Sequence, residues 1–151
     1  MAVKLKNKKL LIWLILFLFI IDRITKYLSF NLPQEGIFYL PSLGFKHYLN
    51  TGIAFSIPMP LYILIPIILI IIFSLTWHLV KYYLNSHIAI FPISLIIIGA
   101  LSNLLDRIEY NGVIDFIDIS TFPAFNLADT YITIGVIWLI YLIIKKRNKI
   151  G

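Results

Sequence analysis

The sequence predicts an all-α membrane protein: four transmembrane helices with a small extracytoplasmic β element and a short outer loop or helix. Of its 151 residues, 60% are hydrophobic and only 13% are charged. The mean hydropathy of +0.93 is far above that of ordinary soluble domains. The apolar residues form long runs, and most of the basic residues lie in two terminal clusters. We expect a single domain over residues 1–151.

Four segments meet or approach the length of about 20 apolar residues that a helix needs to span a bilayer. They are residues 10–30, 61–80, 88–105 and 128–144. The first segment follows a basic stretch, as the apolar part of a signal peptide does. It continues through Asp22 and Lys26 without a small-residue cleavage site, so we interpret it as a retained span.

The distribution of basic residues predicts the orientation in the membrane. Lysine and arginine cluster at both ends of the chain, and Lys81 lies in the short connection between the second and third segments. The positive-inside rule therefore places both termini and this connection in the cytoplasm. The longer connections, 31–60 and 106–127, then face outward. The first has aromatic, alternating stretches that end in Asn50-Thr51-Gly52, which favours a small sheet lying on the membrane.

Composition excludes several classes of site. The chain has no cysteine, so disulfides, thiolate metal sites and cysteine nucleophiles are excluded. The three histidines are scattered without metal-ligand spacing, and we expect no metal and no cofactor. The net charge of +6 comes mostly from the terminal clusters, which is typical of membrane topology and not of nucleic-acid binding.

Two aspartates, Asp115 and Asp129, are the first candidates for a functional site. Both lie in polar islands of an otherwise lipid-soluble sequence, where burying an ionisable group costs about 2–4 kcal/mol. Asp129 has a structural alternative as a helix N-cap, and Asp115 as an exposed loop residue. Gly112 before one aspartate, and Asn126 and Ala128 beside the other, favour a shared catalytic site.

Two pairs at helical spacing lie near the outer face. Lys26 follows Asp22 at i+4 with the acid first, which is the favourable order for an ion pair. The alternative to a functional role is an ion pair that fastens helices together or reaches the interface. Asn103 and Arg107 repeat the spacing, and we expect them to be scaffold or lipid-headgroup contacts and not direct catalysts.

Four motifs in order resemble the lipoprotein signal peptidases, the type II signal peptidase family of aspartic membrane proteases. They are DRITK at 22–26, NTGIAFS at 50–56, NLLDR at 103–107 continuing to GVIDFID at 112–118, and FPAFNLAD at 122–129. Each motif alone is weak, but four in family order across nearly the whole chain are specific. Two departures are small: Ile53 replaces a common alanine, and Ser102 replaces the glycine usual before the asparagine.

The resemblance implies that Asp115 and Asp129 form a catalytic dyad. It further implies a set of residues that line or support the site: Asp22, Lys26, Asn50, Gly52, Asn103, Arg107, Asn126 and Ala128. The implied reaction is cleavage of diacylglyceryl-modified prolipoproteins just before the lipidated cysteine. We therefore expect a monomeric, multi-pass enzyme of the bacterial cytoplasmic membrane, in contact with membrane lipids, with its active site at the outer face.

Other function classes remain to be weighed. A proton-coupled small membrane carrier could relay protons through Asp22, Asp115 and Asp129, but midplane acids and internal repeats would suit it better. A membrane scaffold without activity would leave the outer acids without a role. Aspartyl proteases of the presenilin or prepilin-peptidase type are expected to carry Gly-x-Gly-Asp, which this chain lacks.

Overall fold

The computed structural model describes residues 8–53, 57–84, 88–119 and 122–147. They form four helices and one four-stranded antiparallel sheet. The helices are α1 (Lys8–Ser29), α2 (Leu61–Leu84), α3 (Ile90–Tyr110) and α4 (Leu127–Arg147). The strands are β1 (Ile37–Leu40), β2 (Leu43–Asn50), β3 (Val113–Ile119) and β4 (Phe122–Phe125).

Helix α3 is the centre of the helical layer. It packs against the other three helices, and apolar side chains bury most of its first half. Its contact with α4 is close because two glycines lie in the interface. A Cβ at Gly99 would come within 2.5 Å of the Ala128 carbonyl oxygen, and one at Gly135 within 2.7 Å of the Pro92 carbonyl oxygen. The helices meet backbone to backbone, as is common where small residues line a membrane helix interface.

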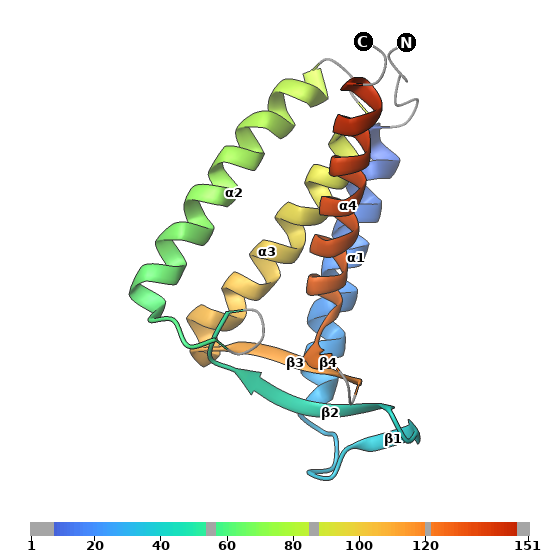
Figure 1. Cartoon of the computed structure of the whole chain (residues 1–151), viewed down its shortest axis with the longest axis vertical. Coiled ribbons are helices and arrows are strands. Elements are labelled where there is room, and N and C mark those ends of the chain that lie inside the picture. The colour runs from blue at the N-terminus through green and yellow to red at the C-terminus, as the bar shows by residue number, and fades with distance from the viewer. Residues whose placement is uncertain (1–7, 54–56, 85–87, 120–121, 148–151) are drawn as a thin grey trace.

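The sheet lies across one end of the helical layer (Figure 1). Its strands follow chain order, β1-β2-β3-β4. A two-residue turn at Pro41 and Ser42 joins β1 to β2, and Asn111, in the left-handed conformation with φ 57°, ends α3 and turns the chain into β3. The start of α1 and the end of α4 lie together at the opposite end of the molecule (Figure 1).

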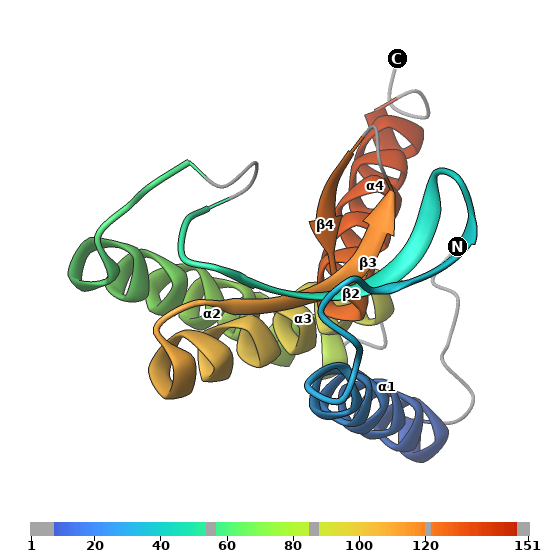
Figure 2. The same ribbon diagram turned by 90° about the horizontal axis from the view of Figure 1, so that it is seen from below.

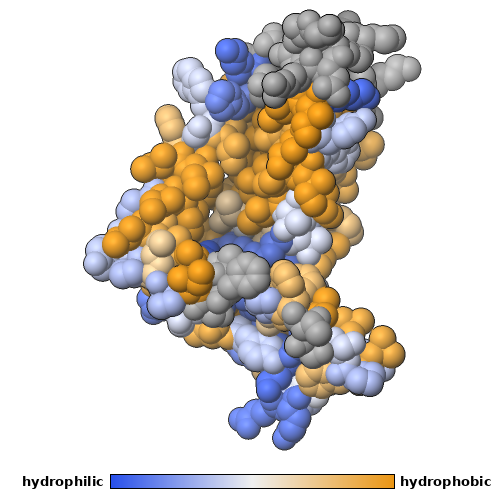
Figure 3. Space-filling view, viewed as in Figure 1, coloured by the Kyte–Doolittle hydropathy of each residue, from blue (hydrophilic) through white to orange (hydrophobic). Residues whose placement is uncertain are grey.

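Among the residues that the structure describes, three helices are long and apolar enough to cross a membrane: Leu61–Lys81, Ile90–Tyr110 and Leu127–Lys145. They correspond to the second, third and fourth predicted spans. The first predicted span coincides with the helix α1, which carries three charged residues, Asp22, Arg23 and Lys26, near its C-terminal end. Figure 3 shows hydrophobic residues covering the helical layer and hydrophilic residues at its two ends.

The outer connection differs from the prediction in two ways. The third helix continues past Leu105 to Tyr110, so Asp106 and Arg107 are helical. The short outer loop or helix predicted beyond it is wrong, because the segment forms β3 and β4 instead. Val113–Ile119 is rich in β-branched residues and pairs with β2, which the sequence did predict to be extended.

Candidate active site

Asp115 lies in the middle of β3, at the interface between the sheet and the helices. Its side chain is almost completely buried, with the residue 2% exposed. Asn50, on the neighbouring strand β2, donates from Nδ2 to one carboxylate oxygen at 3.1 Å. Asn126 donates from Nδ2 to the other oxygen at 2.7 Å. Asp115 is therefore not the exposed loop residue of the structural alternative.

Asp129 lies in the first turn of α4. The helix begins at Leu127, so the N-cap is Asn126 and the alternative of Asp129 as N-cap is wrong. The two side chains form a reciprocal capping box: the backbone N–H of Asp129 donates to Asn126 Oδ1 at 2.9 Å, and the backbone N–H of Asn126 donates to Asp129 Oδ2 at 3.2 Å. The capping box holds the Asp129 carboxylate at the N-terminus of α4.

Asn126 connects the two candidate catalytic acids. It is fully buried, and its side-chain amide donates to Asp115 while its carbonyl oxygen accepts from the backbone of Asp129. The same amide donates to the carbonyl oxygen of Ile114 at 3.2 Å. One residue thus positions both carboxylates, because any rotation of its amide would break contacts to each.

Both aspartates line one cavity of about 300 Å³. Polar groups from two further elements share its wall, namely Asn50 of β2 and Asn103 and Arg107 of α3. The rest of the wall is mostly apolar and comes largely from β4 and α4. A second cavity of about 250 Å³ also reaches Asp129 and continues along α4 past Thr133 to Ile134. The site therefore joins a polar centre to an apolar surface.

Arg107 brings a positive charge to this cavity. It donates to the carbonyl oxygens of Asn103 at 3.2 Å and Gly52 at 3.4 Å. Gly52 is held in turn by its own N–H, which donates to Asn50 Oδ1 at 3.0 Å in an Asx turn. Arg107, Gly52 and Asn50 therefore tie the end of β2 to the end of α3 beside Asp115.

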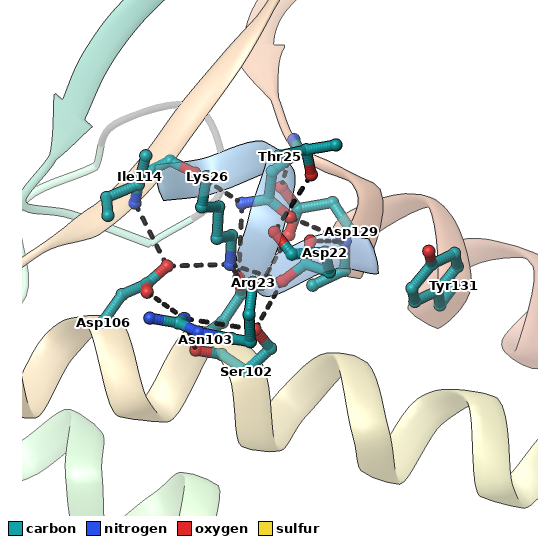
Figure 4. Close-up of polar contacts among 12 residues, drawn as sticks. Asp22, Arg23, Thr25, Lys26, Ser102, Asn103, Asp106, Ile114, Asp129 and Tyr131 are labelled. Carbon is teal, nitrogen blue, oxygen red and sulfur yellow. Dashed lines mark hydrogen bonds and ion pairs between the residues drawn. The ribbon is translucent and has the colours of Figure 1, made fainter. Parts of the chain in front are cut away.

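A buried ionic network supports the site from the helix side (Figure 4). Lys26 is fully buried, and its Nζ lies 3.2 Å from Asp22 Oδ2 and 2.7 Å from Asp106 Oδ2. The predicted i+4 pair with Asp22 is thus confirmed. Lys26 also donates to Asn103 Oδ1 at 2.8 Å, and Asn103 donates from Nδ2 to Asp129 Oδ1 at 2.8 Å. A continuous chain of polar contacts runs from the ion pair to Asp129.

Asp22 reaches the start of α4 directly. It accepts from the backbone N–H of Ala128 at 2.8 Å and from the hydroxyl of Ser102 at 2.5 Å. Ala128 is fully buried against it. Ser102, which replaces the glycine usual at this position, therefore gives Asp22 an additional hydrogen-bond donor. The two predicted support residues Asp22 and Ala128 are in direct contact.

Sequence reasoning missed two members of this network, Asp106 and Arg23. Asp106 is fully buried, pairs with both Lys26 and Arg23, and accepts from the backbone N–H of Ile114 at 3.3 Å. Arg23 also donates to the Ser102 carbonyl oxygen at 3.3 Å. The available signal for Asp106 was its position in the NLLDR motif, between the implied support residues Asn103 and Arg107.

The surroundings of Asp115 favour its protonated form. Burial, and then the negative charge of Asp129, raise the pKa of Asp115 to about 7, against the hydrogen bonds from Asn50 and Asn126 that lower it. This carboxyl is therefore poised to hold or release a proton near neutral pH, which is the property required of a general acid or base.

The chain resembles known signal peptidases over almost its whole length. The model of the family described as signal peptidase (SPase) II matches residues 14–145. A lipoprotein signal peptidase of Thermodesulfovibrio yellowstonii is 41% identical, over 97% of this chain and 100% of the relative. One from Streptococcus pneumoniae is 31% identical, over 95% and 97% of the two chains.

Two solved structures share the fold. A bacterial membrane enzyme solved by the in meso method at 2.3 Å resolution superimposes with a TM-score of 0.79 and 29% identity, covering 94% of this chain and 92% of the other. A second, at 1.9 Å resolution, gives a TM-score of 0.74 and 30% identity, covering 91% and 94%. With the family match and the relatives, these establish that the chain belongs to the signal peptidase II family.

Proposed function

We propose that this signal peptidase II removes signal peptides from diacylglyceryl-modified prolipoproteins by aspartic catalysis, with Asp115 and Asp129 as the catalytic pair. One observation carries the proposal: two carboxylates from different elements line the same cavity and are both held by Asn126. An arrangement built only for stability would not direct two acids into a shared cavity.

The pair acts with one proton between its two carboxyl groups, because neighbouring carboxylates do not readily both ionise. The ionised carboxylate accepts a proton from a water molecule, whose oxygen attacks the scissile carbonyl carbon. The protonated carboxyl donates its proton to the carbonyl oxygen. When the tetrahedral intermediate collapses, the C–N bond breaks and the leaving amine takes a proton from the pair. One hydroxyl of the intermediate returns its proton to the pair as the new carbonyl forms, which restores the single proton of the starting state. No covalent intermediate forms.

The surrounding residues orient the pair. Asn50 and Asn126 hold Asp115, and Asn103 together with the capping box holds Asp129. Arg107 offers positive charge in the cavity as negative charge develops on the substrate. These residues bind and orient, while the two aspartates transfer protons.

We further propose that α1 is a fourth span, with both termini in the cytoplasm and the site at the outer membrane face. The basic clusters near both ends of the chain support this orientation. The helices α1 and α4 have their outer ends at the sheet and their other ends together at the far side (Figure 1).

The comparisons give no support to the proton-coupled carrier. The carboxylates of a carrier are expected near the membrane midplane, whereas Asp115 lies in a sheet at one end of the helical layer. Asp22 is likewise committed to a buried ion pair and two hydrogen bonds.

The decisive experiment is cleavage of a precursor by the purified chain in detergent, with and without the diacylglyceryl group on the cysteine. We expect the parent to cut the lipidated precursor, and Asp115→Asn and Asp129→Asn to abolish cleavage while the proteins still fold. An amide is nearly isosteric with the carboxylate but does not accept the proton of the water. The matched control is Asp118→Asn, three residues along β3 and hydrogen-bonded to Tyr48 outside the cavity. Near-parental turnover by either catalytic-pair variant would remove the aspartic mechanism.

A further inference from the structure

A second cavity lies next to the catalytic one, across the helix face of α4 that carries Asp129 and Thr133. The two cavities share part of their walls, namely Phe122, Phe125, Asp129 and Thr133. Because Asp129 and Thr133 are four residues apart, they lie one above the other on α4. Ile132 lines only the catalytic cavity, whereas Thr130 and Ile134 line only the second one. A ligand of the second cavity therefore lies next to Asp129.

The walls of the second cavity are mainly apolar. The rings of Phe122 and Phe125 meet edge to face, with their centroids 6.1 Å apart. The hydroxyl of Thr130 donates to the Asn126 carbonyl oxygen at 3.2 Å, so this polar group is satisfied within the helix. Among the described residues that line the cavity, Asp129 alone is charged. A ligand that fits here is therefore apolar along most of its length.

The cavity continues into an exposed hydrophobic stripe of α4, formed by Ile134, Ile137 and Tyr141. These residues are 47%, 63% and 55% exposed, and their spacing places them on one helix face. Helix α4 runs from the sheet to the opposite end of the molecule, so the stripe leads away from the site along the helical layer (Figure 1). Figure 2 shows β4 alongside α4, with α2 well away from both. An apolar chain that lies along the stripe reaches the cavity from the lipid.

The size of the cavity distinguishes between the two apolar parts of the proposed substrate. One turn of a helix with its side chains is about 10 Å wide and about 5.4 Å long, and it fills roughly 400 Å³. The cavity holds about 250 Å³, which is less than one turn of a signal-peptide helix. An acyl chain is an unbranched row of methylene groups and is far narrower. In the proposed reaction, the acyl chains belong to the cysteine that directly follows the scissile bond.

We propose that the second cavity binds one acyl chain of the diacylglyceryl group on the precursor, and that Thr130 and Ile134 contact this chain. This inference rests on the proposed function and deepens it, because it assigns lipid recognition to named residues of the same site. The acyl chain gains little affinity by leaving the bilayer, since lipid tails are as apolar as the cavity. Its contribution is to orient the scissile bond in front of Asp129.

The first test measures the cleavage efficiency, kcat/KM, of precursors whose diacylglyceryl chains range from acetyl to palmitoyl. Ile134→Trp fills the cavity with a larger side chain. We expect it to lower the efficiency on the palmitoyl precursor roughly tenfold or more, and we expect the loss to shrink as the chains shorten. Thr130→Phe, which changes a second lining residue, should show the same dependence. Cleavage of the shortest precursor that the parent cuts shows that the variants fold.

The matched control for chain length is Ile67→Trp on α2. Ile67 is the seventh residue of α2 and Ile134 the eighth of α4, and they are 43% and 47% exposed. Because Ile67 lines neither cavity, we expect no loss that depends on chain length. If Ile134→Trp lost nothing, or lost equally at every chain length, the inference would be overturned. A parent that cuts no lipidated precursor would instead refute the proposed function.

The second test locates the acyl chain directly. A precursor with a diazirine in one acyl chain is bound to Asp115→Asn, which is expected not to cut it, and is then illuminated. We expect labels on α4 around Ile134 and Ile137, and an excess of precursor without diazirine should suppress them. A second precursor carries the diazirine in the apolar part of its signal peptide and should label other segments. Stronger labelling of the stripe by this second precursor, or acyl-chain labels that favour α2, would overturn the inference.

Discussion

Asp22→Ala is expected to weaken the fold more than it weakens the chemical step. The carboxylate is fully buried, and three groups depend on it: the ammonium of Lys26, the hydroxyl of Ser102 and the backbone N–H of Ala128. Alanine removes the acceptor from all three. None of these contacts involves a reacting group, although Ala128 precedes Asp129.

The size of the effect follows from what remains around Lys26. Breaking a buried ion pair by removing one partner costs about 3–5 kcal/mol. Lys26 keeps Asp106 at 2.7 Å and Asn103 at 2.8 Å, so its charge is still partly compensated. The lower end, about 3 kcal/mol, is therefore expected. At roughly 2–4 °C per kcal/mol for a chain of this size, the melting temperature should fall by about 6–12 °C.

The assay is thermal unfolding in detergent, followed by the fluorescence of the three tryptophans, together with turnover measured well below the transition. Glu109→Ala is the matched control, because Glu109 is 58% exposed and lies 4.0 Å from Arg23. A surface pair of this kind contributes less than about 1 kcal/mol. If Asp22→Ala melted like the parent and yet lost all activity, Asp22 would belong to the catalytic centre and this reasoning would be wrong.

Three further outcomes are expected. The double variant Asp115→Asn with Asp129→Asn should be scarcely less active than either single variant, because the effects of two residues that share one step do not add. The measurement is turnover of lipidated precursor, and a double variant much less active than either single variant would contradict the prediction. The folded chain holds a proton on Asp115 up to about pH 7, whereas the unfolded chain releases it near pH 4, so this carboxyl should make the free energy of unfolding fall as pH rises through that window. Asp115→Asn should make the free energy of unfolding, measured by denaturation at several pH values, depend less on pH. An unchanged dependence would count against the raised pKa of Asp115. A reporter fused after Gly151 should be active only in the cytoplasm, and activity only outside the cell would overturn the proposed topology.

The helices were the most predictable part of the fold. Their apolar runs are long, and the second begins at Leu61 as expected. The third extends five residues beyond its predicted end at Leu105, to Tyr110. The error came from Asp106 and Arg107, which look like loop residues in the sequence but are satisfied by partners on α1 and the sheet side. The sequence pattern predicts a helix end at these polar residues because it does not reveal the distant partners that hold them inside the helix.

Only the part of the sheet around β2 could be predicted from the sequence. The strand β2 follows from its alternating, aromatic sequence, whereas Val113–Ile119 carries two aspartates that obscure the alternation. Asp115 is buried because Asn50 and Asn126 satisfy it, and neither contact follows from local spacing. The roles of Asp106 and Arg23 were missed for the same reason: both depend on α1 meeting α3, about 80 residues apart in the chain.

The ionic network also bears on how many protons the proposed catalytic pair, Asp115 and Asp129, holds. Behind the cavity, the two buried carboxylates of Asp22 and Asp106 are paired with the buried Lys26 and the half-buried Arg23, so these four side chains together have no net charge. Facing the cavity, Arg107 is the cation beside the pair. A pair with one proton carries a single negative charge, which Arg107 balances, whereas a fully ionised pair would leave one negative charge uncompensated in a largely buried site. Electrostatics therefore favours the singly protonated pair that the proposed reaction requires.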